Sequence, residues 1–219
     1  MSLELSGTTG VKGVAGSVSA PSIVGDDTNT GISFPAADTI KFSTGGVERM
    51  AITNSGVSGI TAGITQADLF RLTTTINTPY NSVDVITTNW ERPDEADDMF
   101  DKIGSGMSQS SGVFTFPATG IYLVSFLGRW YANGNTSGEN HLFIDGTVDN
   151  SNYNDLTSSA QNVPNSHTST VYTQTLVDIT DTSNRKVRLK YYAGAGNQRL
   201  IGATNKNETF AIFIRLGDT

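Results

Sequence analysis

Residues 121–127 constrain the fold most, because this segment is apolar on both faces. Its sequence, IYLVSFL, lies in the run GVFTFPATGIYLVSFLGRWY from residue 112 to residue 131. Successive side chains of a strand point to opposite faces, and here the two apolar sets are Ile121, Leu123, Leu127 and Tyr122, Val124, Phe126. The flanking Pro117, Gly120 and Gly128 favour a strand over a helix. A sandwich strand normally buries only one face, so the second needs a cover, and another copy of the chain is the simplest one.

The C-terminal part of the chain has the pattern of an all-β domain. Charged residues are only 16% of the 219 residues, and 23 Gly with many Ser, Thr and Asn indicate turns and uncharged polar surfaces. Short apolar runs predict strands at residues 112–116, 121–131, 141–144, 169–179, 186–192 and 209–216. We expect a turn at Asp145 and Gly146, and mostly exposed loop in the rest of residues 132–168. This spacing predicts an antiparallel sandwich or jelly roll over residues 61–219.

The N-terminal part divides into two segments. Residues 1–20 have little to bury and predict a flexible or extended arm. Within residues 21–60, the runs 39–43 and 47–52 flank a Gly-Gly turn, which predicts a β-hairpin followed by a linker. A single hairpin is marginal by itself, so we expect it to pack against copies of itself or against a host structure. Residues 65–72 are compatible with one or two helical turns.

Charge and cysteine content exclude several classes of function. The net charge is -7, and the 14 Lys and Arg are spread along the chain. Binding to nucleic acid or to an anionic membrane requires clustered cations, so we expect neither. The chain has no Cys, which excludes disulfides and thiolate metal sites. No signal peptide and no apolar window long enough to span a membrane are visible, so we expect synthesis in a cytoplasm without export by a cleavable signal.

Candidate chemistry is sparse. His141 and His167 have no recognisable nucleophile nearby. Glycan cleavage uses two carboxylates on opposite sides of the substrate, and the only dense acidic group, residues 94–98, consists of neighbours in one loop, so we expect no enzyme. The densest acidic group could supply oxygen ligands to calcium, with a solvated loop as the alternative; its members are Asp94, Glu95, Asp97 and Asp98. The polar segments 132–140 and 147–168 could recognise a glycan or a protein, as paratope loops do, or be inert; the candidate residues are Asn133, Asn135, Tyr153 and Asn154.

The opening run also carries a family resemblance. Gly112, Phe114, Thr115, Pro117, Gly120 and Tyr122 match a motif of the complement one-q-like domain, a trimeric jelly roll related to tumour necrosis factor. Residues 100–104 and 142–146 resemble further segments of that domain, and the resemblance covers roughly residues 68–219. It implies a jelly roll that forms tight homotrimers around an apolar axis. We assign the interface to Tyr122, Val124 and Phe126, with Phe213 as a weaker candidate, while which face of the strand meets the axis stays open.

Residues 38–52, DTIKFSTGGVERMAI, resemble segments of tailed-bacteriophage fibre and other virion proteins. The resulting hypothesis is a homotrimeric structural protein of a phage virion. Residues 1–60 would anchor it to other virion proteins, and the C-terminal knob would bind a receptor or glycan on the host surface. One alternative is a capsid decoration protein that stabilises the shell. The other is a soluble cellular module, similar to a lectin or a cytokine.

Overall fold

The chain divides into two compact units, Met1–Gly63 and Ile64–Thr219. The computed structural model describes residues 4–6, 10–12, 15–59, 63–94, 98–134 and 137–219. These residues form strands, turns and loops without any helix, and every strand pair is antiparallel. Consequently the described part of the chain has no helix that could cross a membrane.

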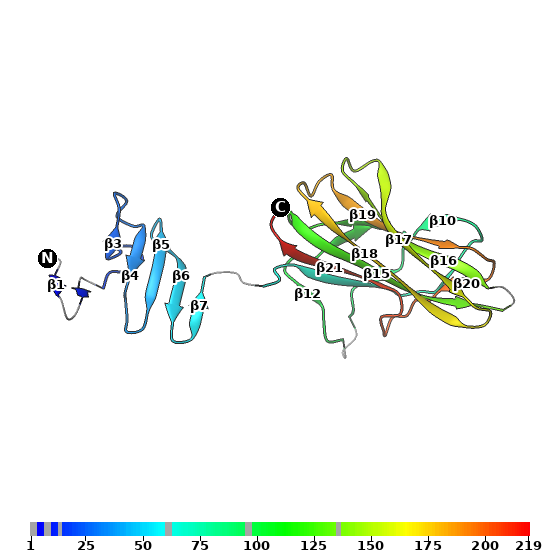
Figure 1. Cartoon of the computed structure of the whole chain (residues 1–219), viewed down its shortest axis with the longest axis horizontal. Helices are drawn as coiled ribbons and strands as arrows, with labels where there is room; N and C mark the ends of the chain where they lie inside the picture. The colour runs from blue at the N-terminus through cyan, green and yellow to red at the C-terminus, as the bar shows by residue number, and fades with distance from the viewer. Residues whose placement is uncertain (1–3, 7–9, 13–14, 60–62, 95–97, 135–136) are drawn as a thin grey trace. The chain divides into compact units, whose positions relative to one another are not determined.

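The N-terminal unit is a sheet larger than the predicted hairpin. Figure 1 shows its strands side by side in chain order, and they are β3 (Ile23–Val24), β4 (Gly31–Ser33), β5 (Ile40–Thr44), β6 (Val47–Thr53) and β7 (Gly56–Ser58). The predicted hairpin corresponds to β5 and β6. Its turn contains Gly45 and Gly46 at positive φ of 59° and 74°, a conformation that glycine adopts without strain. Within the predicted arm, β1 (Glu4–Ser6) pairs with β2 (Gly10–Lys12).

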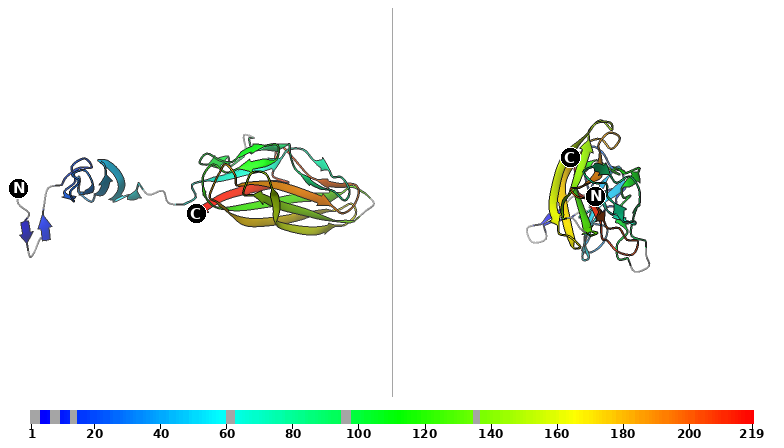
Figure 2. Two further views of the ribbon diagram at one scale, coloured as in Figure 1. Left: turned by 90° about the horizontal axis from the view of Figure 1, so that it is seen from above. Right: turned by 90° about the vertical axis from the view of Figure 1, so that its right-hand side faces the viewer.

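The C-terminal unit is a jelly-roll sandwich of two sheets, seen as two layers in the end-on view of Figure 2. The eight-stranded sheet has the order β11-β8-β21-β15-β20-β9, with β18 on β15 and β12 on β8. Its strands are β8 (Ala67–Leu72), β9 (Ile76–Asn77), β11 (Trp90–Glu91), β12 (Lys102–Ile103), β15 (Gly120–Ala132), β18 (Thr168–Ile179), β20 (Gln198–Leu200) and β21 (Phe210–Gly217).

The six-stranded sheet faces it, with the order β13-β14-β19-β16-β17 and β10 on β19. Its strands are β10 (Val83–Val85), β13 (Ser108–Ser110), β14 (Val113–Thr115), β16 (Gly138–Thr147), β17 (Tyr153–Val163) and β19 (Lys186–Ala193). The all-β, antiparallel jelly roll predicted from the sequence is therefore confirmed.

Three local predictions are wrong. Residues 65–72 contain a strand instead of helical turns, because β8 pairs with β21 on one side and with β11 and β12 on the other. Most of residues 132–168 is a long hairpin, β16 and β17, instead of loop. The expected turn at Asp145 is a β-bulge inside β16. The polar composition was misleading because β17 lies at a sheet edge, where most of its side chains are exposed.

Aromatic side chains fill the space between the two sheets. The ring of Phe114 lies 5.0 Å from that of Phe213 and 5.3 Å from that of Phe70, measured between centroids. Trp90 packs edge-on against both Phe114 and Phe126. Full burial of one such side chain contributes roughly 1.5–3 kcal/mol to folding, so this cluster is the main apolar core of the unit.

Two glycines of the family motif are required by the local backbone conformation. Gly112 has φ +81°, and a Cβ there would lie 2.6 Å from the carbonyl oxygen of Ile86. Gly120 has φ +140°, and its Cβ would lie 2.5 Å from the carbonyl oxygen of Gly217. Both distances are shorter than any carbon–oxygen contact, and both backbone conformations favour glycine. These two positions of the family motif therefore specify the turns around β14 and the start of β15.

Candidate functional site

The four residues assigned to the trimer interface lie in the core of the chain itself. Tyr122, Val124, Phe126 and Phe213 are each at most 1% exposed. Val124 pairs with Phe213 across β15 and β21, so both side chains lie on the sheet face that meets the six-stranded sheet. A second copy of the chain cannot contact them without opening the sandwich. The assignment of these residues to the interface is therefore corrected: the even-numbered face of β15 is the inner one.

The other face of the same strands forms an apolar surface, which we call the outer face. Residues paired across antiparallel strands point to the same side of a sheet, and the register places three rows of side chains on this surface. The apolar members are Leu69 from β8, Phe210, Ile212 and Ile214 from β21, Leu123 and Leu127 from β15, and Tyr172 and Leu176 from β18. Tyr172 and Leu176 are 46% and 60% exposed, and the others are half-buried by their neighbours.

The polar groups within the outer face bond to one another. Ser125 pairs with Ile212 and is only 8% exposed. The Tyr172 hydroxyl donates to the Ser125 Oγ at 3.2 Å. At one end of the face, the Arg129 guanidinium contacts the Glu208 carboxylate at 2.5 Å. An apolar centre bordered by paired polar groups is the usual anatomy of a protein–protein interface.

A buried arginine borders the outer face on β8. The Arg71 side chain has no solvent exposure, and its nitrogens lie 2.9 Å from Glu91, 3.1 Å from Asp94 and 3.0 Å from Asp98. Burial alone lowers the pKa of this guanidinium, but hydrogen bonds and the charges of Glu91 and Asp98 outweigh burial and raise the pKa above its usual value. Arg71 is therefore a fixed cation beside the apolar surface.

The contacts of Arg71 also account for two residues of the acidic segment. Asp94 and Asp98, two of the four calcium candidates, direct carboxylate oxygens at Arg71. Glu95 and Asp97 lie outside the described residues. Among the residues that are described, no group of three or more acidic or histidine side chains is arranged to hold a metal ion. Arg71 thus occupies the position where the carboxylates of Asp94 and Asp98 converge.

The candidate recognition residues that the structure describes, Asn133, Tyr153 and Asn154, lie in two separate places. Asn133 follows β15 and donates its backbone N–H to the Asn197 carbonyl at 2.9 Å. Tyr153 and Asn154 begin β17, next to the far end of β16, and Arg188 lies 3.6 Å above the Tyr153 ring. The ten residues of β16 separate these places, which is about 30 Å at roughly 3.3 Å per residue. Asn135 lies outside the described residues. The candidate residues of the two polar segments therefore lie at opposite ends of the β16–β17 hairpin, and recognition by either end stays a prediction.

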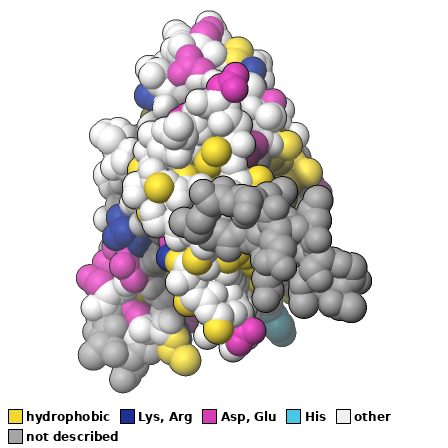
Figure 3. Space-filling model, turned by 90° about the vertical axis from the view of Figure 1, so that its left-hand side faces the viewer, with side chains coloured by type: hydrophobic (Ala, Val, Ile, Leu, Met, Phe, Trp, Pro, Cys, Tyr) yellow, Lys and Arg dark blue, Asp and Glu magenta, His cyan; other side chains and the backbone are white. Residues whose placement is uncertain are grey.

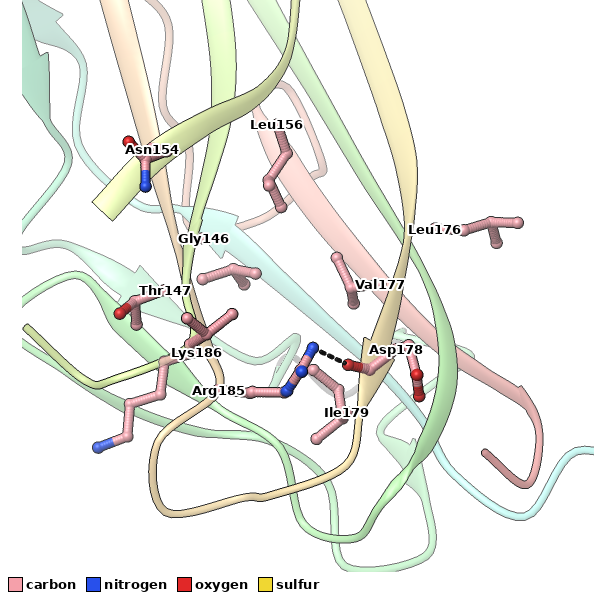
Figure 4. A pocket seen from close by; sticks show the side chains of 12 residues that line it. Gly146, Thr147, Asn154, Leu156, Leu176, Val177, Asp178, Ile179, Arg185 and Lys186 are labelled. Carbon is pink, nitrogen blue, oxygen red and sulfur yellow. Dashed lines mark hydrogen bonds between the residues drawn. The ribbon is translucent and has the colours of Figure 1, made fainter. Parts of the chain in front are cut away.

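A pocket of about 270 Å³ opens near Asn154, between the ends of β16, β17, β18 and β19. Figure 4 shows Leu156, Val177 and Ile179 around it, while Leu176 points away from them. At its rim, the Arg185 guanidinium donates to the Asp178 carbonyl at 2.9 Å. Ligand pockets usually measure roughly 300–1,000 Å³ and carry convergent polar groups. This one is small and its floor is apolar, so it is a weaker candidate than the outer face.

The surface beyond these sites is mixed. In the space-filling view of Figure 3, apolar side chains reach the surface between acidic ones. The chain as a whole carries 21 Asp and Glu against 14 Lys and Arg, and several of the cations are held in ion pairs such as that of Arg188 with the buried Asp145. Acidic side chains therefore outnumber basic ones in the chain, and part of the basic charge is neutralised in ion pairs.

Comparison with known proteins supports the fold. The structure of Eiger TNF from S. frugiperda aligns with a TM-score of 0.51 and 15% sequence identity, over 72% of this chain and 96% of that chain. Murine APRIL at pH 8.0 aligns with a TM-score of 0.49 and 12% identity, over 69% of this chain and 98% of that chain. No protein-family model matches the chain, and no curated protein matches it. The C-terminal unit thus has the jelly-roll fold of tumour necrosis factor-like proteins.

Proposed function

We propose that the chain is a non-catalytic, homotrimeric binding protein whose jelly rolls associate through the outer face. The observation that carries this proposal is the apolar surface spanning β8, β21, β15 and β18. Contiguous exposed apolar patches mark interaction sites. The motif from Gly112 to Tyr122 adds support, because the resemblance to complement one-q-like domains implies a trimer. Arg71 takes the place of a metal in this proposal, so no cofactor is needed for assembly.

We further propose that this trimer is a fibre or decoration protein of a tailed-phage virion, anchored through residues 1–60 and binding a host-surface receptor or glycan with its knob. Residues 38–52, which resemble virion protein segments, support this placement. A soluble cytokine-like module has the same jelly roll and is the second candidate, favoured by the fold that the chain shares with Eiger TNF. Immunogold labelling of phage particles separates the candidates: label on tail or head supports the virion role, and absence of label from particles favours the soluble module.

The trimer itself is tested by multi-angle light scattering. At micromolar concentration, the molar mass measured for the wild type should be three times the 23.3 kDa of one chain. Ile212→Asp places one unpaired carboxylate per subunit in the centre of the outer face. Burial of an unpaired charge costs several kcal/mol (roughly 3–5 when a buried partner is lost), so this variant should be monomeric. Val148→Asp is the matched control, because Val148 is 68% exposed and lies off the face.

Folding and assembly are separated by a second variant. Leu176 is already 60% exposed in the single chain, so Leu176→Asp leaves the sandwich core unchanged and should weaken the trimer without unfolding the jelly roll. A wild-type monomer, or an Ile212→Asp chain that remains trimeric, would contradict the assignment of the outer face.

A further inference from the structure

The N-terminal sheet has an apolar face of its own. Its register joins Ile23, Ile32, Phe42 and Met50 in one row across β3 to β6. A second row joins Ile40, Ile52 and Val57 across β5 to β7. Because residues two apart on a strand share a face, both rows lie on the same side of the sheet. One side of this small sheet thus carries seven large apolar side chains.

The two faces of this sheet are buried in the opposite way from a sheet that covers its own apolar face. On the apolar face, Ile23, Ile52 and Val57 are 57%, 38% and 58% exposed. The other four residues, Ile32, Ile40, Phe42 and Met50, are half-buried. On the opposite face, the small side chains of Ser33, Ser43 and Ala51 are buried, at most 3% exposed. An antiparallel sheet that is covered on one side normally covers its apolar side. Folding of the unit therefore leaves this face only partly covered, and most of its exposed area lies at the edge strands β3 and β7.

The size and charge of this surface indicate its occupant. The face spans five strands and about four residues along them, which is roughly 300 Å² at strand spacings of about 4.8 Å. A stable interface between separate proteins takes roughly 800 Å² from each partner. The seven side chains include no charge, so the face has no electrostatic preference for a basic or an acidic partner. Such a surface suits identical copies that are already held together.

The covalent connection to the jelly roll would hold the copies of the N-terminal sheet together. β7 ends at Ser58 and β8 begins at Ala67, and the residues between them reach at most about 30 Å when fully extended. β8 belongs to the sheet that carries the outer face, so in a trimer the three connections begin on strands near the axis. Tethering of this kind gives an effective concentration of roughly millimolar, at which a small apolar face associates.

We propose that three copies of the N-terminal sheet pack their apolar faces together, forming a second trimerisation element on the same chain. This inference rests on the proposed trimer of jelly rolls and extends it: residues 23–57 act as a clamp between subunits as well as a segment that leads to the particle.

Single cysteines test the proposal, because the chain has no Cys of its own. Val57→Cys and Ser58→Cys are a matched pair: both residues are exposed in one chain and they point to opposite faces of β7. Thiol reactivity follows exposure, so maleimide should label Val57→Cys at least about tenfold more slowly than Ser58→Cys in the native protein. Ile32→Cys, at the centre of the face, should form disulfide-linked dimers on mild oxidation, and Ser58→Cys should not.

Light scattering on the same samples distinguishes the possible failures. A trimer in which both thiols of the matched pair react equally would overturn the clamp and leave the jelly-roll trimer standing. A monomer would overturn the proposed trimer, and the clamp with it. Protection of Val57→Cys in a monomer would show that the same chain covers the face, which also refutes the proposal. Because the purified sample contains this chain alone, protection together with crosslinking in a trimer can come only from other copies.

Discussion

Substitution of Arg71 by Met gives a quantitative test of the charged cluster beside the outer face. The Arg71 side chain is fully buried and holds Glu91, Asp94 and Asp98. Met has a similar length but no charge, so the variant keeps most of the packing and leaves three carboxylates facing one another. We expect a less stable jelly roll, because repulsion between these carboxylates is then no longer compensated.

The size of the loss follows from the exposure of the partners. Removing one partner from a fully buried ion pair costs about 3–5 kcal/mol. Here the three carboxylates are 28%, 70% and 21% exposed, so they regain part of their hydration and the expected loss is about 2–3 kcal/mol. For a chain of this size, 1 kcal/mol shifts Tm by about 2–4 °C, which predicts a decrease of about 4–12 °C.

Tryptophan fluorescence is the appropriate assay, because both Trp residues of the chain, Trp90 and Trp130, belong to the jelly roll. Unfolding in urea at one fixed protein concentration keeps any contribution from assembly constant. Arg49→Met, at an exposed position of the N-terminal unit, is the control and should leave the transition unchanged.

A double-mutant cycle completes the test. Asp98→Asn combined with Arg71→Met should recover part of the lost stability, because it removes one of the uncompensated charges. A loss below about 0.5 kcal/mol for Arg71→Met, within the range of an ordinary surface substitution, would refute the reasoning. So would simple additivity of the two substitutions.

Three further predictions follow from the described contacts. Millimolar calcium should leave the Tm of the wild type unchanged and raise that of Arg71→Met, since only in the variant do Glu91, Asp94 and Asp98 lack the Arg71 cation; a shift in the wild type would contradict this. Hydrogen bonds from Arg129 and Lys206 lower the pKa of Glu208, so its contribution is present above the unfolded pKa and is lost as pH falls through the folded value. Urea titrations should therefore show that the wild type loses more stability than Glu208→Gln on acidification, by less than about 1 kcal/mol because Arg129 is 41% exposed. Phe114→Ala should cost about 3–5 kcal/mol in chemical denaturation, and a loss below about 1 kcal/mol would mean that Phe114 is not central to the core.

The residues that carry the family resemblance are mainly those that build the fold. Gly112 and Gly120 occupy positive-φ positions where a Cβ would collide with backbone oxygens. Phe114 is fully buried, and the Tyr122 hydroxyl donates to the Ala118 carbonyl at 3.0 Å. A motif of this kind predicts the jelly roll well, because backbone conformation and core volume restrict which residues fit. The motif does not predict the exposed loops, because many different residues are compatible with the same loop structure.

Local composition was a poor guide where strand pairing decided the structure. The segment around Tyr153 looked like a loop, because the exposed side of an edge strand has the same polar residues as a loop. The acidic residues from Asp94 to Asp98 had the composition of a metal site, but Arg71, more than twenty positions away in the chain, supplies the positive charge. Contacts between residues so far apart in the chain result from sheet pairing, and a short stretch of sequence does not predict which strands pair.

The alternation of residues 121–127 by itself determined that this segment is a strand with two apolar faces, and hence that something must cover each of them. Only the tertiary structure decided which face is inside. Both sets of side chains are apolar, so hydrophobicity does not distinguish them, and a shift of one residue exchanges the two faces completely. The pairing of β15 with β21 and β18, and the aromatic cluster between the two sheets, place Tyr122, Val124 and Phe126 in the core. Leu123 and Leu127 then remain on the outer face, where we propose that other copies of the chain cover them.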